Sequence, residues 1–117
     1  MVVQFANLPC SSLVFVHGLN GDHIGTWKHD ASGVVWPRDL IPQKMPHARV
    51  LSFSYDADVH DDTSVSRIRD HARTLLNFLK DERSDISRKI PIVFIAHSLG
   101  GLVVKQVRPD TNATLPD

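Results

Sequence analysis

Three short apolar runs, separated by segments of helical or loop character, constrain the fold of this 117-residue chain more than any other feature. The runs are SLVFVHG at 12–18, ARVLSFSY at 48–55 and IPIVFIA at 90–96, all rich in β-branched and aromatic residues. Continuous apolar runs, as opposed to alternating ones, are typical of strands buried on both faces of a parallel sheet. We therefore predict three parallel, buried strands at these positions.

Helices are predicted between and after the strands. Residues 64–83 place apolar side chains at three- and four-residue spacing, which gives an amphipathic helix one buried stripe. A short helix is expected from near Pro37 to just before Pro46, and another opens at Leu99. This order requires right-handed crossovers, so the predicted fold class is α/β, a parallel three-stranded sheet with flanking helices.

The length of the chain allows one domain and argues against two. We expect an N-terminal extension at 1–11, an α/β domain at 12–107 and an irregular tail at 108–117. The tail is assigned because two prolines and several turn-forming residues end the helical periodicity after Val107.

Charge and hydropathy exclude several classes of partner. Thirteen basic residues balance thirteen acidic ones, so nothing favours nucleic acid or an anionic membrane. No apolar run approaches the roughly 18 residues of a membrane span, and the first residues lack signal-peptide character. The single cysteine, Cys10, fits a reducing compartment. A cytoplasmic location is therefore expected.

The third predicted strand ends at a serine flanked by small residues, in the stretch AHSLGG at 96–101. Hydrolases of the α/β class expose a nucleophilic serine on a tight strand-to-helix turn, normally with the pattern G-x-S-x-G. Alanine replaces the first glycine here, and Gly100 occupies the second position. We predict that Ser98 is a catalytic nucleophile; the alternative is a serine in a tight turn without chemistry.

Two backbone amides are candidates for an oxyanion hole. The helix after Ser98 would direct its unpaired N–H groups at a developing oxyanion, with Leu99 as one donor. The His-Gly pair that ends the first strand precedes a loop that supplies another donor in such enzymes. Leu19 is the predicted second donor, and Gly18 is the alternative.

Four residues form the predicted supporting site: His17, Gly18, His97 and Gly100. The two histidines flank the serine at strand ends. We expect both to support the site and not to act as its general base, because the histidine of this type of site comes from a later loop.

Three segments together resemble a known family. VFVHGLNGDHIGTW, VLSFSYDAD and VFIAHSLGGLVVKQ are similar, in the same order, to the putative serine esterases (DUF676, lipase-like) of the α/β-hydrolase superfamily. The resemblance runs from about Leu13 to Val107. It extends to serine-active-site-containing proteins and to the hydrolase domains that begin many fungal NACHT-type signalling proteins.

The resemblance implies a serine hydrolase acting on an ester or acyl-lipid substrate. It also makes the mitochondrion or the endoplasmic reticulum an alternative location. In this superfamily the triad follows the chain order serine, acid, histidine. The residues from 99 to 117 contain no histidine, and no strand pattern positions Asp110 or Asp117 as the acid. We therefore expect the truncated N-terminal half of an α/β-hydrolase domain, inactive on its own.

Two alternatives to an esterase stay open. The first is a catalytically inactive remnant that acts as a binding or signalling module, with a protein partner covering the open, uncharged edge of the third strand. The second is a doubly wound nucleotide-binding domain, which the loop HGLNGDHIG supports poorly because it lacks the G-x-G-x-x-G pattern.

No cofactor and no metal are predicted. An EF-hand loop starting at Asp56 would need glycine at its sixth position and glutamate at its twelfth, where the chain has Asp61 and Arg67. A solvated turn is expected there, with a minor role of Asp56 in the pocket as an alternative. Trp27 and Trp36 are expected to cover the sheet.

Overall fold

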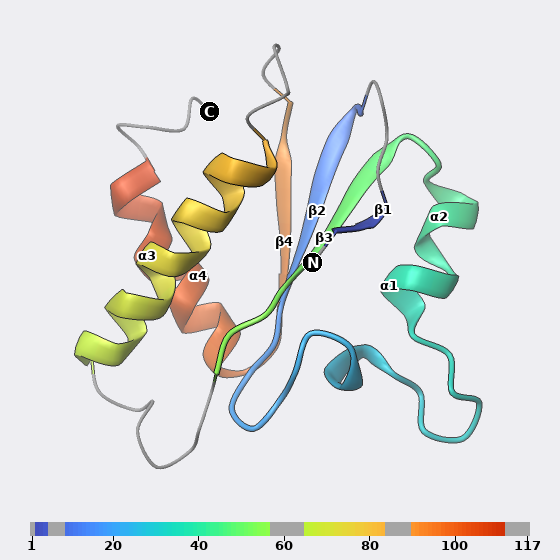
Figure 1. Cartoon of the computed structure of the whole chain (residues 1–117), viewed down its shortest axis with the longest axis horizontal. Helices are drawn as coiled ribbons and strands as arrows, with labels where there is room; N and C mark the ends of the chain where they lie inside the picture. Colours follow the sequence, from blue (N-terminus) through green and yellow to red (C-terminus); the bar gives the residue numbers. More distant parts are fainter. Residues whose placement is uncertain (1, 5–8, 57–64, 84–89, 112–117) are drawn as a thin grey trace.

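A four-stranded sheet with the order β1-β3-β2-β4 forms the centre of the structure (Figure 1). The structure, a computed structural model, describes residues 2–4, 9–56, 65–83 and 90–111. The strands are β1 (Val2–Gln4), β2 (Ser11–Val16), β3 (Ala48–Phe53) and β4 (Ile92–Ala96). β2 pairs in parallel with both β3 and β4, which confirms the three predicted parallel strands. β1, which the sequence did not predict, pairs antiparallel with β3.

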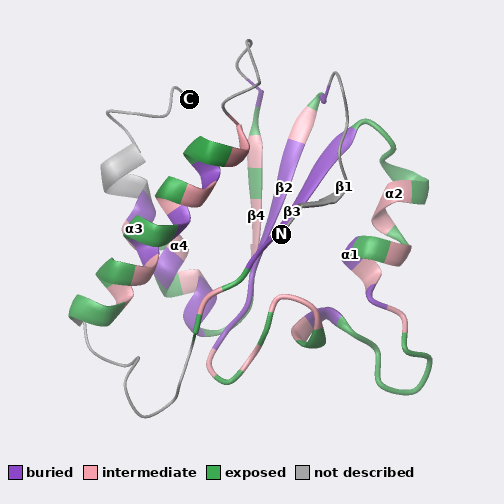
Figure 2. Cartoon of the chain, viewed as in Figure 1, coloured by how far each residue is buried: buried purple, intermediate pink, exposed green. Residues whose placement is uncertain are grey.

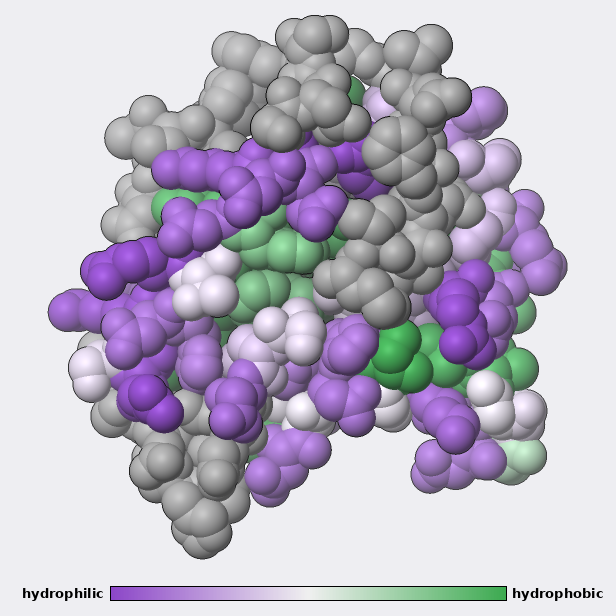
Figure 3. Space-filling view, viewed as in Figure 1, coloured by the Kyte–Doolittle hydropathy of each residue, from purple (hydrophilic) through white to green (hydrophobic). Residues whose placement is uncertain are grey.

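Helices cover both faces of the sheet (Figure 1). One face carries α3 (Val65–Glu82) and α4 (Leu99–Thr111), and the other carries α1 (Trp36–Asp39), α2 (Ile41–Lys44) and the 3₁₀ turn η1 (Gly25–Trp27). The long predicted helix is confirmed as α3, whose outward side is hydrophilic (Figure 3). None of the described helices is both long and apolar enough to cross a membrane.

Two helices differ in extent from their predicted bounds. The single short helix expected after Pro37 is two short helices that meet at Leu40. Pro42 explains the break, because it has no N–H to donate to the carbonyl of Arg38 and its ring crowds that carbonyl. α4 continues to Thr111, past the point where the apolar periodicity stops.

Burial follows the position of each strand in the sheet (Figure 2). The strands β2 and β3 are almost entirely buried, as predicted, because they lie between neighbours and under helices on both faces. β4 is not: none of its five residues is buried, and Val93 is 47% exposed. Among the described strands only β2 pairs with β4, so its outer edge is open. The prediction of a buried third strand was therefore wrong for β4.

The face under α1 and α2 is closed by an aromatic cluster. The rings of Trp27 and Trp36 lie edge-on to Phe15 of β2, with centroids 5.2 and 4.9 Å away, and edge-on to each other at 5.9 Å. Edge-to-face packing at such distances is favourable for aromatic rings. Both tryptophans therefore cover the sheet, as the sequence predicted.

The first turn of α4 lies directly against the end of β2. A Cβ atom added at Gly100 would meet the carbonyl oxygens of Val16 and His17, the latter at 2.6 Å. A Cβ atom at Gly101 would have nothing within 4 Å. Of the two adjacent glycines, only Gly100 is required by the close approach of the helix to the sheet.

This difference gives a matched pair of variants. Gly100→Ala is expected to lower the free energy of unfolding by roughly 1–3 kcal/mol, because the backbone carbonyls it would meet cannot move without disturbing β2. Gly101→Ala is expected to be neutral or to stabilise the fold by up to about 1 kcal/mol, since alanine favours helices over glycine. Urea unfolding of both variants measures the difference. Equal destabilisation by the two would contradict the packing described here.

Candidate active site

The two predicted motifs meet at the carboxyl ends of β2 and β4. β2 lies between β3 and β4, so the chain moves to opposite sides of β2 in its two crossovers. Such a switch point is where ligands bind in open α/β sheets. A Cβ atom at Gly18, after β2, would lie 2.7 Å from the Cβ of Ser98 and 2.6 Å from the carbonyl oxygen of His97. The turn that carries the serine therefore packs against the His-Gly pair, with no room for a larger residue at Gly18.

Ser98 has an uncommon backbone conformation. Its φ is +56°, and among the described residues only one other non-glycine residue, Asn20, has a positive φ. Ladder pairing with β2 continues to the His97 N–H, which donates to the Val16 carbonyl at 3.0 Å. α4 begins at Leu99, directly after the serine, so strand changes to helix within two residues. A conformation of this type costs of order 1–3 kcal/mol, and it holds the Ser98 side chain exposed at the tip of the turn.

The two predicted oxyanion donors are present as N–H groups without a described acceptor. Leu99 is the first residue of α4, so its N–H has no partner within the helix. Neither the Leu99 nor the Leu19 N–H donates a hydrogen bond to another described residue. Leu19 is half-buried in the loop after β2, next to the glycine that contacts Ser98.

An aspartate orders that loop. The Asp22 carboxylate accepts hydrogen bonds from the N–H groups of Ile24, at 2.8 Å, and Gly25. The Asp22 N–H in turn donates to the hydroxyl of Thr26 at 3.1 Å. These backbone donors stabilise the charged form and lower the pKa of Asp22. Asp22 was not predicted from the sequence, although aspartate side chains in turns commonly accept hydrogen bonds from backbone N–H groups two residues further along.

Two further hydrogen bonds hold the same loop. The Gly21 N–H donates to the Gly18 carbonyl at 3.0 Å, across the turn that contains Asn20 and its positive φ. The hydroxyl of Ser52, on β3, donates to the carbonyl of His23 at 2.6 Å. The loop that carries Leu19 is therefore closed by a hydrogen bond of its own and tied to β3 by a second one.

His17 is fully buried, and both of its ring nitrogens contact the backbone. Its Nδ1 lies 3.0 Å from the Gly18 carbonyl oxygen, and its Nε2 lies 3.5 Å from the Tyr55 nitrogen. Burial lowers the pKa of His17, so the ring is neutral near pH 7. His97 is exposed. No described side chain hydrogen bonds with the Ser98 hydroxyl, so neither histidine is placed as its base.

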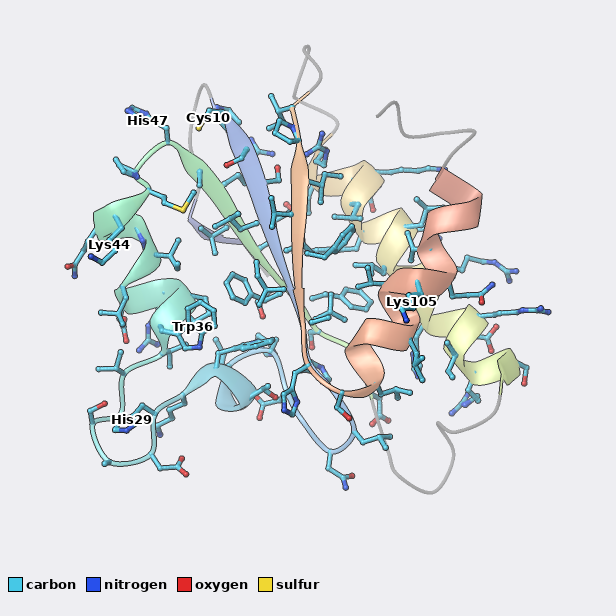
Figure 4. All side chains as sticks on the ribbon, turned by 180° about the vertical axis from the view of Figure 1, so that it is seen from behind. Cys10, His29, Trp36, Lys44, His47 and Lys105 are labelled. Carbon is cyan, nitrogen blue, oxygen red and sulfur yellow. The ribbon has the colours of Figure 1, made fainter. Side chains whose placement is uncertain are left out.

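The remaining candidates lie apart from this site. Cys10 is at the opposite end of β2, beside His47, whose carbonyl oxygen accepts from the Cys10 N–H at 3.0 Å (Figure 4). Asp56 is exposed directly before the undescribed segment 57–64, and Asp61 falls within that segment. In the described part of the chain, no cluster of three or more histidine, cysteine, aspartate or glutamate side chains could hold a metal ion.

Comparison with known proteins agrees with this architecture. Residues 11–108 match the family described as putative serine esterase (DUF676). Protein SERAC1 of Danio rerio is 28% identical over 122 residues, covering 86% of this chain and 18% of that protein. Protein SERAC1 of Mus musculus is 28% identical over 131 residues, covering 90% and 20%. Protein SERAC1 of Homo sapiens is 26% identical over 120 residues, covering 83% and 17%.

The chain thus spans about a fifth of the length of these relatives. The family match begins at the first residue of β2 and ends within α4, so it contains the three parallel strands, the loop after β2 and Ser98. On this evidence the chain belongs to the DUF676 family of putative serine esterases, as its three motifs indicated.

Proposed function

We propose that this chain carries the nucleophile and the oxyanion hole of an esterase- or lipase-type serine hydrolase that acts on an ester or acyl-lipid substrate. The observation that carries the proposal is the exposed Ser98, held at φ +56° on a strand-to-helix turn that packs against Gly18. This is the arrangement that a nucleophile elbow requires, because the strained turn lifts the hydroxyl out of the sheet. Ala96 and Gly100 occupy the small-residue positions on either side.

The proposed reaction uses the serine in two steps. The Ser98 oxygen attacks the ester carbonyl carbon while a general base takes its proton, and the negative charge moves to the carbonyl oxygen. The N–H groups of Leu19 and Leu99 would donate to this oxyanion, with the amino end of α4 adding a positive dipole. The tetrahedral intermediate then breaks down, the alcohol leaves with the proton held by the base, and the acyl group remains as an ester on Ser98. In the second step water attacks this ester, the acid leaves, and the Ser98 hydroxyl is restored.

The general base and its acid partner are proposed to lie further along the polypeptide. This follows the chain order of the superfamily, in which both come after the nucleophile. The absence of a hydrogen-bonded partner for the Ser98 hydroxyl among the described side chains supports the proposal. So does the greater length of the SERAC1 relatives, of which this chain matches 17–20%.

Three finer predictions from the sequence stay proposals. They are the similarity to fungal NACHT-associated hydrolase domains, the limits of the domain at 12–107, and the cytoplasmic location with mitochondrion or endoplasmic reticulum as alternatives.

A second candidate function is that of a binding module without catalysis. The observation that favours it is the open edge of β4, an all-apolar strand with Val93 47% exposed, next to α4 with Leu102 50% exposed. An apolar edge with unpaired backbone groups accepts another strand. The proposed occupant is β4 of a second copy, because neither the uncharged strand nor the net charge of zero opposes self-association.

The hydrolase proposal is tested by labelling with a fluorophosphonate probe in the complete natural polypeptide that contains these residues. We expect covalent labelling of Ser98, confirmed by peptide mass spectrometry, and its loss in Ser98→Ala. Ser54→Ala is the matched control, since Ser54 is also exposed after a strand end and should leave labelling unchanged. Failure to label Ser98 in the folded natural protein would reject the hydrolase.

The binding-module alternative is tested by the oligomeric state of the chain. Val93→Lys places a charge on the edge strand and is expected to shift the protein from dimer to monomer in light scattering. Asn77→Lys, which adds the same charge to an exposed position of α3, is expected to leave the dimer intact. A wild-type protein that is monomeric at micromolar concentration would contradict self-association through β4.

A further inference from the structure

The direction of the Leu19 N–H is set by the peptide unit that joins Gly18 to Leu19. A trans peptide is planar, so its N–H points away from its own carbonyl. The Gly18 carbonyl oxygen accepts two hydrogen bonds, from Nδ1 of His17 and from the N–H of Gly21, both at 3.0 Å. These two bonds hold the carbonyl and thereby fix the direction of the Leu19 N–H.

His17 is in turn held by Tyr55 through three interactions. The two rings are stacked, with centroids 4.2 Å apart and planes inclined by 12°. The Tyr55 hydroxyl donates to the His17 carbonyl oxygen at 2.6 Å, and the Tyr55 N–H approaches His17 Nε2 at 3.5 Å. Tyr55, which lies two residues after the end of β3, therefore contacts both the ring and the backbone of His17.

These contacts also fix where the His17 proton lies. A carbonyl oxygen can only accept, so Nδ1 must carry the hydrogen that it shares with Gly18. Nε2 then has a lone pair, which faces the Tyr55 N–H. The ring is neutral, in keeping with the burial that lowers its pKa. Only the Nδ1–H tautomer satisfies both neighbours.

The Tyr55 ring packs against two further aromatic rings. Its ring is nearly parallel to that of Phe53 on β3, at 5.3 Å, and contacts the ring of His71 on α3, at 4.7 Å. The His17 carbonyl that accepts from the Tyr55 hydroxyl is the one that lies against Gly100 of α4. Tyr55 thus restrains two successive peptide units, His17–Gly18 through its hydroxyl and Gly18–Leu19 through the His17 ring.

We propose that Tyr55 is a positioning residue which, acting through His17, aims the Leu19 N–H at the oxyanion formed on the substrate of Ser98. This inference rests on the proposed function. It assigns to Tyr55, which lies two residues after β3, control over one of the two oxyanion donors.

The test compares rates of Ser98 phosphonylation by the fluorophosphonate probe in wild-type protein and in Tyr55→Phe. Phenylalanine keeps the stacking ring and removes only the hydroxyl. Misdirecting an oxyanion donor should lower the maximal labelling rate roughly tenfold, less than the 10²–10³-fold loss of a whole donor, with the half-saturating probe concentration unchanged. Ser54→Ala, which removes the neighbouring exposed hydroxyl, should label at the wild-type rate.

A second measurement needs no catalysis. Nitrogen-15 NMR of His17 should show the Nδ1–H tautomer in wild-type protein and in folded Tyr55→Phe, because the two groups that fix it, the Gly18 carbonyl and the N–H of residue 55, both belong to the backbone. A folded Tyr55→Phe variant with an unchanged labelling rate, or an Nε2–H tautomer in wild-type protein, would overturn the role of Tyr55 alone. An unlabelled wild-type protein would overturn the proposed hydrolase and, with it, this role.

Discussion

The parallel pairing of β2 with β4 is the interaction on which the rest of the candidate site depends. It brings together the ends of two strands, Val16 and Ala96, which are 80 residues apart in the sequence, and the pairing continues to the His97 N–H, which donates to the Val16 carbonyl. From that register follow the contact between Gly18 and Ser98 and the contact between Gly100 and the end of β2. A shift of one residue would turn every side chain of β4 to the other face.

Backbone, more than side chains, defines this site. The two proposed oxyanion donors are amides, and the residues nearest to them are glycines whose replacement would collide with carbonyl oxygens. Apart from Ser98, the side chains described at the site, Asp22, His17 and Tyr55, act by accepting from or donating to that backbone. Such an arrangement is rigid, because backbone groups held by hydrogen bonds have little freedom to move.

The sequence predicted what depends on local pattern. Continuous apolar runs identified β2, β3 and β4, and three- and four-residue periodicity identified α3. β1 was missed because three residues carry too little pattern, and its strand is defined by pairing with β3. The exposure of β4 could not be predicted either, since burial depends on strand order and not on composition.

The candidate site shows the same division. Ser98 and the His-Gly pair were recognisable because the motif lies within a few residues of each strand end. The contact between Tyr55 and His17 joins residues 38 positions apart. It depends on β3 lying beside β2, so no spacing in the sequence indicates it. Among the described side chains none hydrogen bonds with the Ser98 hydroxyl, and no local pattern in the sequence indicates its proton acceptor.

The left-handed backbone conformation of Ser98 lowers the stability of the fold. Glycine adopts a φ of +56° without penalty, so a chain under selection for folding alone would gain by losing the serine side chain there. Asparagine would also suit that conformation better. Serine at this position therefore costs backbone stability, and its exposed hydroxyl makes no hydrogen bond to a described residue that would offset that cost.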